Sequence, residues 1–383
     1  MSAELSLNLP DYEFIETPAA WSQCLAVLQP QSQLSIDLES NSMYAYQERV
    51  CLIQISVPGH DYIIDPQAGL DLSPLGVMVE DPSVEKIFHA AEYDLMLMKR
   101  DYGWQLQNLF DTMWAVRILG HSKVGLANVL EHYFNVELDK KYQKSNWCHR
   151  PLSAGELAYA QRDTHFLSAL RDVLVAEIKS EGYWEEAQEI FAEQSVVKLP
   201  DTSFSADDFW RLNGVTKLKP EEQAIVKALF IYRDQEARRQ NRPHFKIFGN
   251  KTVLLLAEEK PRYMEDLRQI RGMSFGQIRR YGRQILRIIQ DNEGSAAPKR
   301  PPRRPRTPDD VVERYEMLHQ WRKLRGQARG VESDVILSRD ALWALAHENP
   351  QTIDQLAELN VLGPWRFKTY AADLIEQLQQ KEG

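Results

Sequence analysis

The stretch LSIDLESNSMYAYQERVCLIQISVPGHDYIIDP, residues 34–66, decides the fold of the first part of the chain. It contains three runs rich in Ile, Leu, Val and Tyr, at 34–40, 50–57 and 61–66, and the turn residues Pro58-Gly59-His60 separate the last two. Runs of this length and composition predict strands. Because connections this short favour antiparallel neighbours, the three strands should form a meander in one sheet.

The segment after this meander alternates strand and helix signals. VEKIFHA (84–90) predicts a fourth strand, and AEYDLMLMKRDYG (91–103) predicts a helix with one apolar stripe. Further helices are expected in LFDTMWAVRILG (109–120), VGLANVLEHYFNV (124–136) and SAGELAYAQRDTHFLSALRDVLVAEIKSEG (153–182). The residues spaced for the buried side of the last helix are Leu157, Ala160, Leu167, Leu170 and Leu174. This order predicts an α/β domain of the ribonuclease-H-like kind, with a mixed sheet flanked by helices.

The second half of the chain is predicted to be helical throughout. Strand signals end near residue 200, and helical patterns such as AIVKALFIYRDQEARRQN and FGQIRRYGRQILRIIQ follow. GSAAPKRPPRRPRTP (294–308) is too rich in Pro and Arg to form a core, so it predicts an extended linker. Identities recur at an offset of 89 residues and predict two copies of one helical bundle: Arg233 and Arg322, Ala257 and Ala346, Pro261 and Pro350, Leu267 and Leu356, Tyr281 and Tyr370. The predicted domains are 1–200, 210–293 and 309–383.

Charge is divided unevenly along the chain. The 383 residues carry a formal net charge of −9, which by itself argues against a nucleic-acid partner. However, residues 1–200 hold 14 basic and 29 acidic residues, whereas the remainder holds 32 basic and 26 acidic ones. An acidic first part joined to a basic second part suggests metal chemistry in one and attraction of a polyanion in the other.

The sequence also predicts a cytoplasmic protein without membrane association. No apolar run approaches the roughly 20 residues of a membrane helix, and MSAELSLNLPDYEF at the N-terminus lacks the features of a secretion signal. The cysteines Cys24, Cys51 and Cys148 are odd in number and widely spaced, so they fit neither a disulfide framework nor a zinc site. We therefore expect three reduced thiols, and we expect the protein to be a monomer.

Five residues in the first part predict a catalytic site. Asp37 and Glu39 lie two apart on a predicted strand and so point to one face. Asp94 begins a predicted helix, and Tyr159 and Asp163 are four apart on a later helix, again on one face. Each feature alone is commonly a solvated surface or a helix-terminal acid. If the acids converge, however, a pair of divalent ions could hold them together, and two-metal carboxylate sites cut phosphodiesters.

In combination and order, these residues resemble the DEDD exonuclease superfamily in its tyrosine-bearing branch, and more narrowly the ribonuclease D family. The similar sequence segments are IDLES, VCLIQIS, KIFHAAEYDLMLM, LFDTMWAVRILG and LDKKYQKSNWCHRPLSAGELAYAQRDTHFL, within roughly residues 12–178. The two C-terminal units resemble helicase-and-RNase-D C-terminal (HRDC) domains. The chain departs mildly at Tyr46-Gln47, where relatives often have Tyr-Pro.

The resemblance implies a mechanism. Asp37, Glu39 and Asp163 would hold the first of two divalent ions, and Asp94 would hold the second largely through water. Tyr159 would orient the attacking water, and 5′-mononucleotides would leave from a 3′ end. Oxygen ligands without a Cys/His cluster favour Mg²⁺ or Mn²⁺.

For the HRDC-like bundles, the resemblance implies nucleic-acid contacts. In the first bundle the candidates are Arg279, Arg280, Tyr281 and Arg283, in RRYGRQ. A solvated helix face is the alternative interpretation of that segment. The second bundle carries more acids and could pack against the rest of the protein.

Three functions remain open at this point. The first is a 3′-5′ exoribonuclease that trims tRNA precursors and other structured RNAs. The second is a 3′-5′ DNA exonuclease of repair, and the third is a nucleic-acid-binding adaptor with an inactive nuclease domain. Asp111 is interpreted as a helix cap, and His89 as a packed histidine at a strand end.

Overall fold

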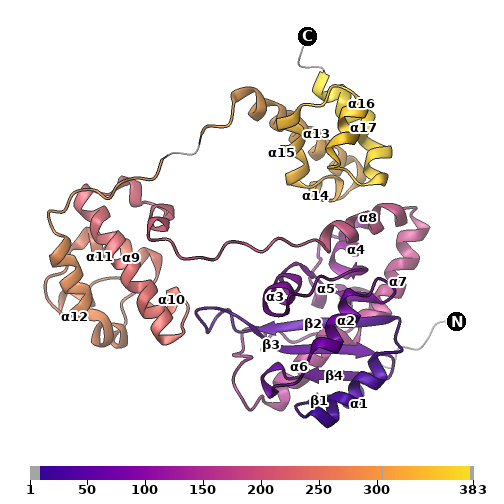
Figure 1. Cartoon of the computed structure of the whole chain (residues 1–383), viewed down its shortest axis with the longest axis horizontal. Helices are drawn as coiled ribbons and strands as arrows, with labels where there is room; N and C mark the ends of the chain where they lie inside the picture. The colour runs from indigo at the N-terminus through magenta and orange to yellow at the C-terminus, as the bar shows by residue number, and fades with distance from the viewer. Residues whose placement is uncertain (1–8, 303–304, 380–383) are drawn as a thin grey trace. The chain divides into compact units, whose positions relative to one another are not determined.

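The computed structural model describes residues 9–302 and 305–379 and divides the chain into two compact units (Figure 1). The first unit comprises residues 1–40, 50–199 and 306–383, and the second comprises residues 41–49 and 200–305. Within the described residues, no helix has both the length and the apolar character that crossing a bilayer requires.

The first unit is built on a six-stranded mixed sheet of order β1-β4-β3-β2-β5-β6. The strands are β1 (Glu13–Ile15), β2 (Gln33–Ser40), β3 (Val50–Val57), β4 (His60–Ile64), β5 (Glu85–Phe88) and β6 (Leu109–Asp111). β3 pairs antiparallel with β2 and β4, as the predicted meander requires. The pairs β1–β4, β2–β5 and β5–β6 are parallel. The predicted mixed sheet is therefore confirmed.

Helices flank this sheet. They are α1 (Pro18–Leu28), α2 (Ser73–Glu80), α3 (Glu92–Tyr102), α4 (Thr112–Ile118), α5 (Leu126–Phe134), α6 (Ala154–His165), α7 (Leu167–Ser180) and α8 (Trp184–Gln194), with a 3₁₀ turn, η1 (Pro66–Ala68). Two predictions were wrong in detail. The start of LFDTMWAVRILG is strand β6, and the long helix expected over 153–182 is two helices that meet at Phe166. Leu157 is half-buried, whereas the other four predicted core residues of this segment are buried.

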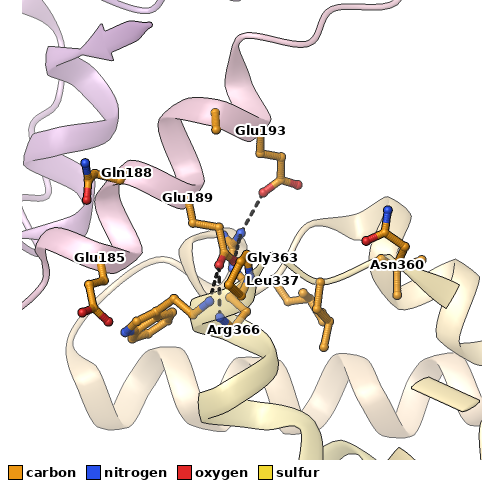
Figure 2. Close-up of a pocket in the computed structure, with 13 residues that line it drawn as sticks. Glu185, Gln188, Glu189, Glu193, Leu337, Asn360, Gly363 and Arg366 are labelled. Carbon is orange, nitrogen blue, oxygen red and sulfur yellow. Dashed lines mark hydrogen bonds and ion pairs between the residues drawn. The ribbon is translucent and has the colours of Figure 1, made fainter. Parts of the chain in front are cut away.

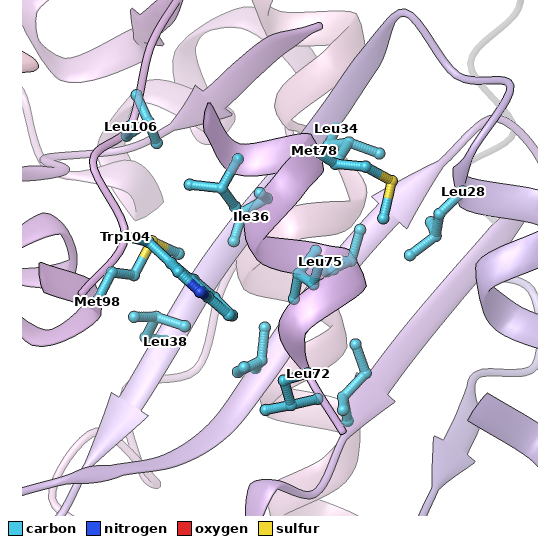
Figure 3. Close-up of a cluster of buried hydrophobic side chains, with 14 of the residues drawn as sticks. Leu28, Leu34, Ile36, Leu38, Leu72, Leu75, Met78, Met98, Trp104 and Leu106 are labelled. Atoms are coloured by element: carbon cyan, nitrogen blue, oxygen red, sulfur yellow. The ribbon is translucent and has the colours of Figure 1, made fainter. Parts of the chain in front are cut away.

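One core cluster lies between the sheet and α2 (Figure 3). Leu34, Ile36 and Leu38 of β2 belong to it together with Leu75 of α2 and Trp104. Alternation along β2 directs these three apolar side chains to one face of the sheet. The polar residues between them point to the opposite face, which is where the candidate site lies.

The expectation of three reduced thiols was wrong. Cys51 of β3 and Cys148 form a disulfide across 97 residues of sequence, and only Cys24 is a free, buried thiol. Spacing along the chain could not show this pairing, because folding of the loop between α5 and α6 against β3 brings the two residues together.

The second unit is a helical bundle. Its elements are η2 (Ala206–Arg211), η3 (Val215–Lys217), α9 (Pro220–Gln240), α10 (His244–Ile247), α11 (Asn250–Glu259), η4 (Asp266–Arg268) and α12 (Phe275–Asn292). Residues 41–49, which follow β2, pack within this unit: the Tyr46 hydroxyl donates a 2.6 Å hydrogen bond to Asp234. YMEDLRQI, expected to be a helix, contains only the short η4.

The C-terminal helices belong to the first unit: α13 (Asp309–Arg329), α14 (Ser333–Ile336), α15 (Arg339–Glu348), α16 (Ile353–Leu359) and α17 (Pro364–Gln379). They repeat the contacts of the helical bundle in the second unit. Arg233 donates a hydrogen bond to the carbonyl of Phe248. The two residues 89 positions later make the same contact, because Arg322 donates to the carbonyl of Leu337. The offset seen in the sequence therefore has a structural counterpart.

This C-terminal bundle packs on α8 through ion pairs. Arg366 pairs with Glu189 and Glu193 of α8 beside a cavity of about 680 Å³ (Figure 2). Arg329 pairs with the buried Glu186 of the same helix. These contacts use basic side chains of the bundle to hold it against the α/β part of the first unit.

Candidate active site

Strand β2 and helix α6 bring three carboxylates together. Oxygen atoms of Asp37, Glu39 and Asp163 lie within 4.8 Å of one another. Asp37 and Glu39 share a face of β2, while Ile36 and Leu38 are buried on the other face. α6 contacts β2, β3 and β4, so Asp163 lies over the face that carries the acidic pair.

Polar contacts fix α6 on the sheet. Gln161 donates a 2.7 Å hydrogen bond to the buried Asp61 of β4, and Nδ1 of His165 lies 2.8 Å from the same carboxylate. Thr164 shares a 2.7 Å hydrogen bond with Ser56 of β3. These residues are interleaved with Asp163 along the helix, so they determine both its depth and its rotation against the sheet.

Asp94 lies in the first turn of α3 and is buried. It is not one of the three clustered acids, but burial raises its pKa well above the usual range, and the charges of Asp37, Asp111 and Asp163 raise it further. Such coupling requires proximity, so Asp94 belongs to the same acidic environment.

Asp111 shapes the turn that leads to α3. Its carboxylate accepts hydrogen bonds from the backbone N–H groups of Ala90 and Ala91, at 3.0 and 2.8 Å, and Ala90 adopts a positive φ of 64°. The same carboxylate accepts hydrogen bonds from Met113 N and Trp114 N at the start of α4. The interpretation of Asp111 as a helix cap is confirmed, and it also holds the turn that precedes Asp94.

The acidic cluster is electrostatically unfavourable without a cation. Burial raises the pKa of Asp37 to about 7. The pKa values of Glu39, Asp94 and Asp163 are raised well above their usual range, first by burial and then by the negative charge of Asp37 and other acids. Buried carboxylates either hold protons or bind cations. The set of hard oxygen donors fits a divalent ion.

Tyr159 is kept as a neutral phenol. Burial raises its pKa far above the usual range, and the charges of Asp163, Glu39 and Asp37 raise it further. Its hydroxyl hydrogen-bonds the carboxylate of Asp163. Tyr159 can therefore orient a water molecule by hydrogen bonding, but it is a poor general base.

Gln54 was not among the residues that the sequence predicted near the site. It is directly opposite Asp37 in the β2–β3 pairing, is fully buried, and has no hydrogen-bond partner for either side-chain polar atom within the described residues. The available signal was a polar residue, Gln54, in the middle of the largely apolar strand sequence VCLIQISV. His89, by contrast, is packed as expected: Nδ1 lies 2.9 Å from Thr112 Oγ1, and burial lowers its pKa to about 4.

Comparison with known proteins identifies each part of the chain. Residues 12–179 match the family of 3′-5′ exonuclease domains, and residues 222–289 and 312–378 each match the HRDC domain. The chain is 27% identical to ribonuclease D of Sphingobium indicum, with 94% of this chain and 92% of that protein covered. It is 28% identical to ribonuclease D of Acidiphilium cryptum, with 97% and 94% covered.

The chain belongs to the ribonuclease D family. Members of this family are hydrolytic 3′-5′ exoribonucleases, and the acidic cluster of this chain lies within its exonuclease domain. The fold agrees: the crystal structure of Escherichia coli RNase D matches with a TM-score of 0.64 at 21% identity, covering 97% of this chain and 99% of that one.

The predicted nucleic-acid face of the first HRDC domain needs one correction. Tyr281 is only 2% exposed and packs in the core of the bundle, with its hydroxyl donating to Gln240. It therefore cannot contact RNA in this structure. Arg279, Arg280 and Arg283 are exposed on α12. Spacing alone could not separate them from Tyr281, because the same helical segment supplies both the buried and the exposed face.

Proposed function

We propose that this chain removes nucleotides one at a time from the 3′ end of RNA and releases 5′-mononucleotides. The observation that carries the proposal is the convergence of Asp37, Glu39 and Asp163, with Asp94 and Tyr159 electrostatically coupled to them. These five positions are those that the family resemblance assigns to catalysis. An inactive adaptor would have no need to keep mutually repelling carboxylates together.

The residues have distinct chemical tasks in this proposal. Asp37, Glu39, Asp94 and Asp163 would hold two divalent ions, Mg²⁺ or Mn²⁺, which when bound supply the positive charge for in-line phosphodiester hydrolysis. The Asp163 carboxylate accepts the Tyr159 hydroxyl hydrogen bond and so fixes the phenol. Tyr159 then orients the attacking water through its oxygen lone pairs. α6 carries both residues, four positions apart and so on one side of the helix.

The proposed substrates are structured RNAs, tRNA precursors above all, handled by a monomer in the cytoplasm. Support comes from the ribonuclease D relatives, which align over more than nine-tenths of their length. Trimming of such RNAs also needs a surface that holds the body of the substrate while its 3′ end is hydrolysed.

The first HRDC domain is the proposed holding surface. Arg279, Arg280 and Arg283 lie on the exposed side of α12, and Phe275 at the start of that helix is 70% exposed. Arginines neutralise phosphates without choosing a sequence, and an exposed aromatic ring can stack on a base. The positions 89 residues later in the second HRDC domain are Lys368, Thr369 and Ala372. Because the second domain has no arginine at these three positions, the first domain is the better candidate for binding RNA.

The test is digestion of a 3′-extended tRNA transcript and a DNA strand of matched sequence, with Mg²⁺ or Mn²⁺. We expect mononucleotide release from RNA that requires metal and is lost in Asp37→Asn. Equal activity of wild type and variant, or persistence of activity in EDTA, would refute the proposed site. Faster digestion of the DNA strand would instead assign the chain to DNA repair.

A further inference from the structure

A long loop supplies two aromatic rings that enclose Tyr159. Residues 135–153 connect α5 to α6, and Trp147 within them is 1% exposed. The ring centroid of Trp147 lies 5.9 Å from that of Tyr159, and the ring centroid of Tyr142 lies 6.4 Å from it in an edge-on arrangement. A Cβ at Gly155 would lie 2.3 Å from the Tyr142 hydroxyl, so this glycine leaves space for the ring. The orientation of the phenol thus depends on the loop.

Arg150 fastens the loop to the sheet. Its guanidinium donates to both carboxylate oxygens of the buried Asp65, at 2.6 and 2.8 Å. It also donates to the carbonyls of Trp147 and Cys51, at 2.6 and 2.8 Å. One side chain therefore joins the residue that packs on Tyr159 to strand β3.

The disulfide makes a second, covalent connection at the same place. Cys148 follows Trp147 directly, and its partner Cys51 is the point at which β2 and β3 change register. Glu39 pairs with Leu52 and Ser40 pairs with Val50, so Cys51 is the extra residue of a bulge beside a candidate metal ligand. Bulges beside active sites set the direction of neighbouring side chains. The bond therefore connects the surroundings of Glu39 to those of Tyr159.

We propose that Trp147 is a positioning residue for Tyr159 and that the Cys51–Cys148 disulfide is a redox switch for this positioning. The inference rests on the proposed nuclease function. In the oxidised protein the loop is fixed and the phenol is aligned. In the reduced protein the two sulfurs move from bonding to van der Waals contact. Because β3 is paired on both sides, the displacement falls on the loop and hence on Trp147.

The switching reaction is a thiol–disulfide exchange. A dithiol such as dithiothreitol transfers two electrons and two protons, becomes a cyclic disulfide, and leaves Cys51 and Cys148 as thiols. Removal of the dithiol and oxidation by oxidised glutathione reverse the change, with two glutathione thiols as the products. Both reagents act through a mixed disulfide, and Cys148 is the more accessible sulfur because it is half-buried whereas Cys51 is fully buried.

The experiment compares the full chain in its oxidised, reduced and reoxidised states after the reagents are removed by gel filtration. Thiol titration of the unfolded protein should give one thiol in the oxidised state and three in the reduced state. Reduction should lower kcat for Mn²⁺-dependent release of mononucleotides by about tenfold, because misalignment of a reacting group by a fraction of an ångström suffices for that. KM should change less than about twofold, because the loop is assigned to alignment and not to RNA affinity. Reoxidation should restore kcat.

Variants separate the switch from a merely structural effect. Cys148→Ser should have the kcat of the reduced protein and no response to dithiol, whereas Cys24→Ala should respond as wild type does. Trp147→Ala should lower kcat in both redox states, and Trp147→Phe should restore part of it. Equal kcat in the oxidised and reduced states, or three thiols before any reduction, would overturn the switch. Inactivity of the folded, oxidised wild type would instead overturn the proposed nuclease function, and the switch with it.

Discussion

Arg366 offers a sharp test of how the second HRDC domain is held. It occupies the position of Gln277 in the first HRDC domain, 89 residues earlier, and the two side chains make the same contact. Gln277 donates to the carbonyl of Ile247, and Arg366 donates to the carbonyl of Ile336. The longer arginine side chain also reaches Glu189 and Glu193 of α8. Arg366→Gln should therefore keep the bundle folded and weaken its packing on the exonuclease domain.

The expected magnitude follows from burial. The side chains of Arg366 and Glu189 are 4% and 10% exposed, so Arg366→Gln leaves the buried Glu189 carboxylate without its charged partner. Removing one partner of a buried ion pair costs about 3–5 kcal/mol of stability. Glu189 keeps two backbone donors, Trp365 N at 2.7 Å and the N–H of residue 366 at 3.3 Å. The cost should therefore fall to about 2–3 kcal/mol. As a matched control, Asp334→Asn breaks the pair with Arg117, and because Asp334 is 44% exposed it should cost at most about 1 kcal/mol.

Hydrogen exchange followed by mass spectrometry is the appropriate assay, because peptides from α14 and α17 report opening of the second HRDC domain separately from the rest of the chain. Arg366→Gln should speed their exchange by about 30- to 150-fold, whereas Asp334→Asn should change it about fivefold at most. A double-mutant cycle with Glu189→Gln should give a coupling energy above about 1 kcal/mol. Equal effects of the two variants, or a coupling energy near zero, would refute this account of docking.

Three further predictions concern the catalytic and RNA-binding residues. In EDTA, Asp37→Asn should have a higher melting temperature than wild type, and the difference should grow as pH rises from about 4 to 7. Because the pKa of Asp37 is raised in the folded state, folding favours its protonated form, and the stability that this form contributes is lost as pH rises through about 7. A difference independent of pH would contradict the burial argument. Tyr159→Phe should lower kcat by about a hundredfold with metal affinity, measured by Mn²⁺ titration calorimetry, unchanged; a matching loss of affinity would make Tyr159 part of the metal site. Arg279→Ala with Arg283→Ala should weaken RNA binding and reduce the salt slope by about two, measured by filter binding, whereas the buried Tyr281→Phe should leave both unchanged.

Local patterns in the sequence were sufficient for much of the fold. Alternation in residues 34–40 places Asp37 and Glu39 on one face, and a four-residue spacing places Tyr159 and Asp163 on one side of a helix. These relations depend only on strand and helix geometry, so they hold wherever the elements lie. The strand β6, the break at Phe166 and the edge strand β1 were not predicted, because three-residue strands and a single helix break have weak local signals.

The sequence by itself determined the domain types, the 89-residue repeat and the identities of the five candidate catalytic residues. Only the tertiary structure decided that Asp37, Glu39 and Asp163 converge, that Cys51 and Cys148 are bonded, and that Tyr281 is buried. The physical reason is the range of the interactions. Backbone periodicity relates residues a few positions apart, whereas these three outcomes depend on how the sheet, the loops and the bundles pack across distant parts of the chain.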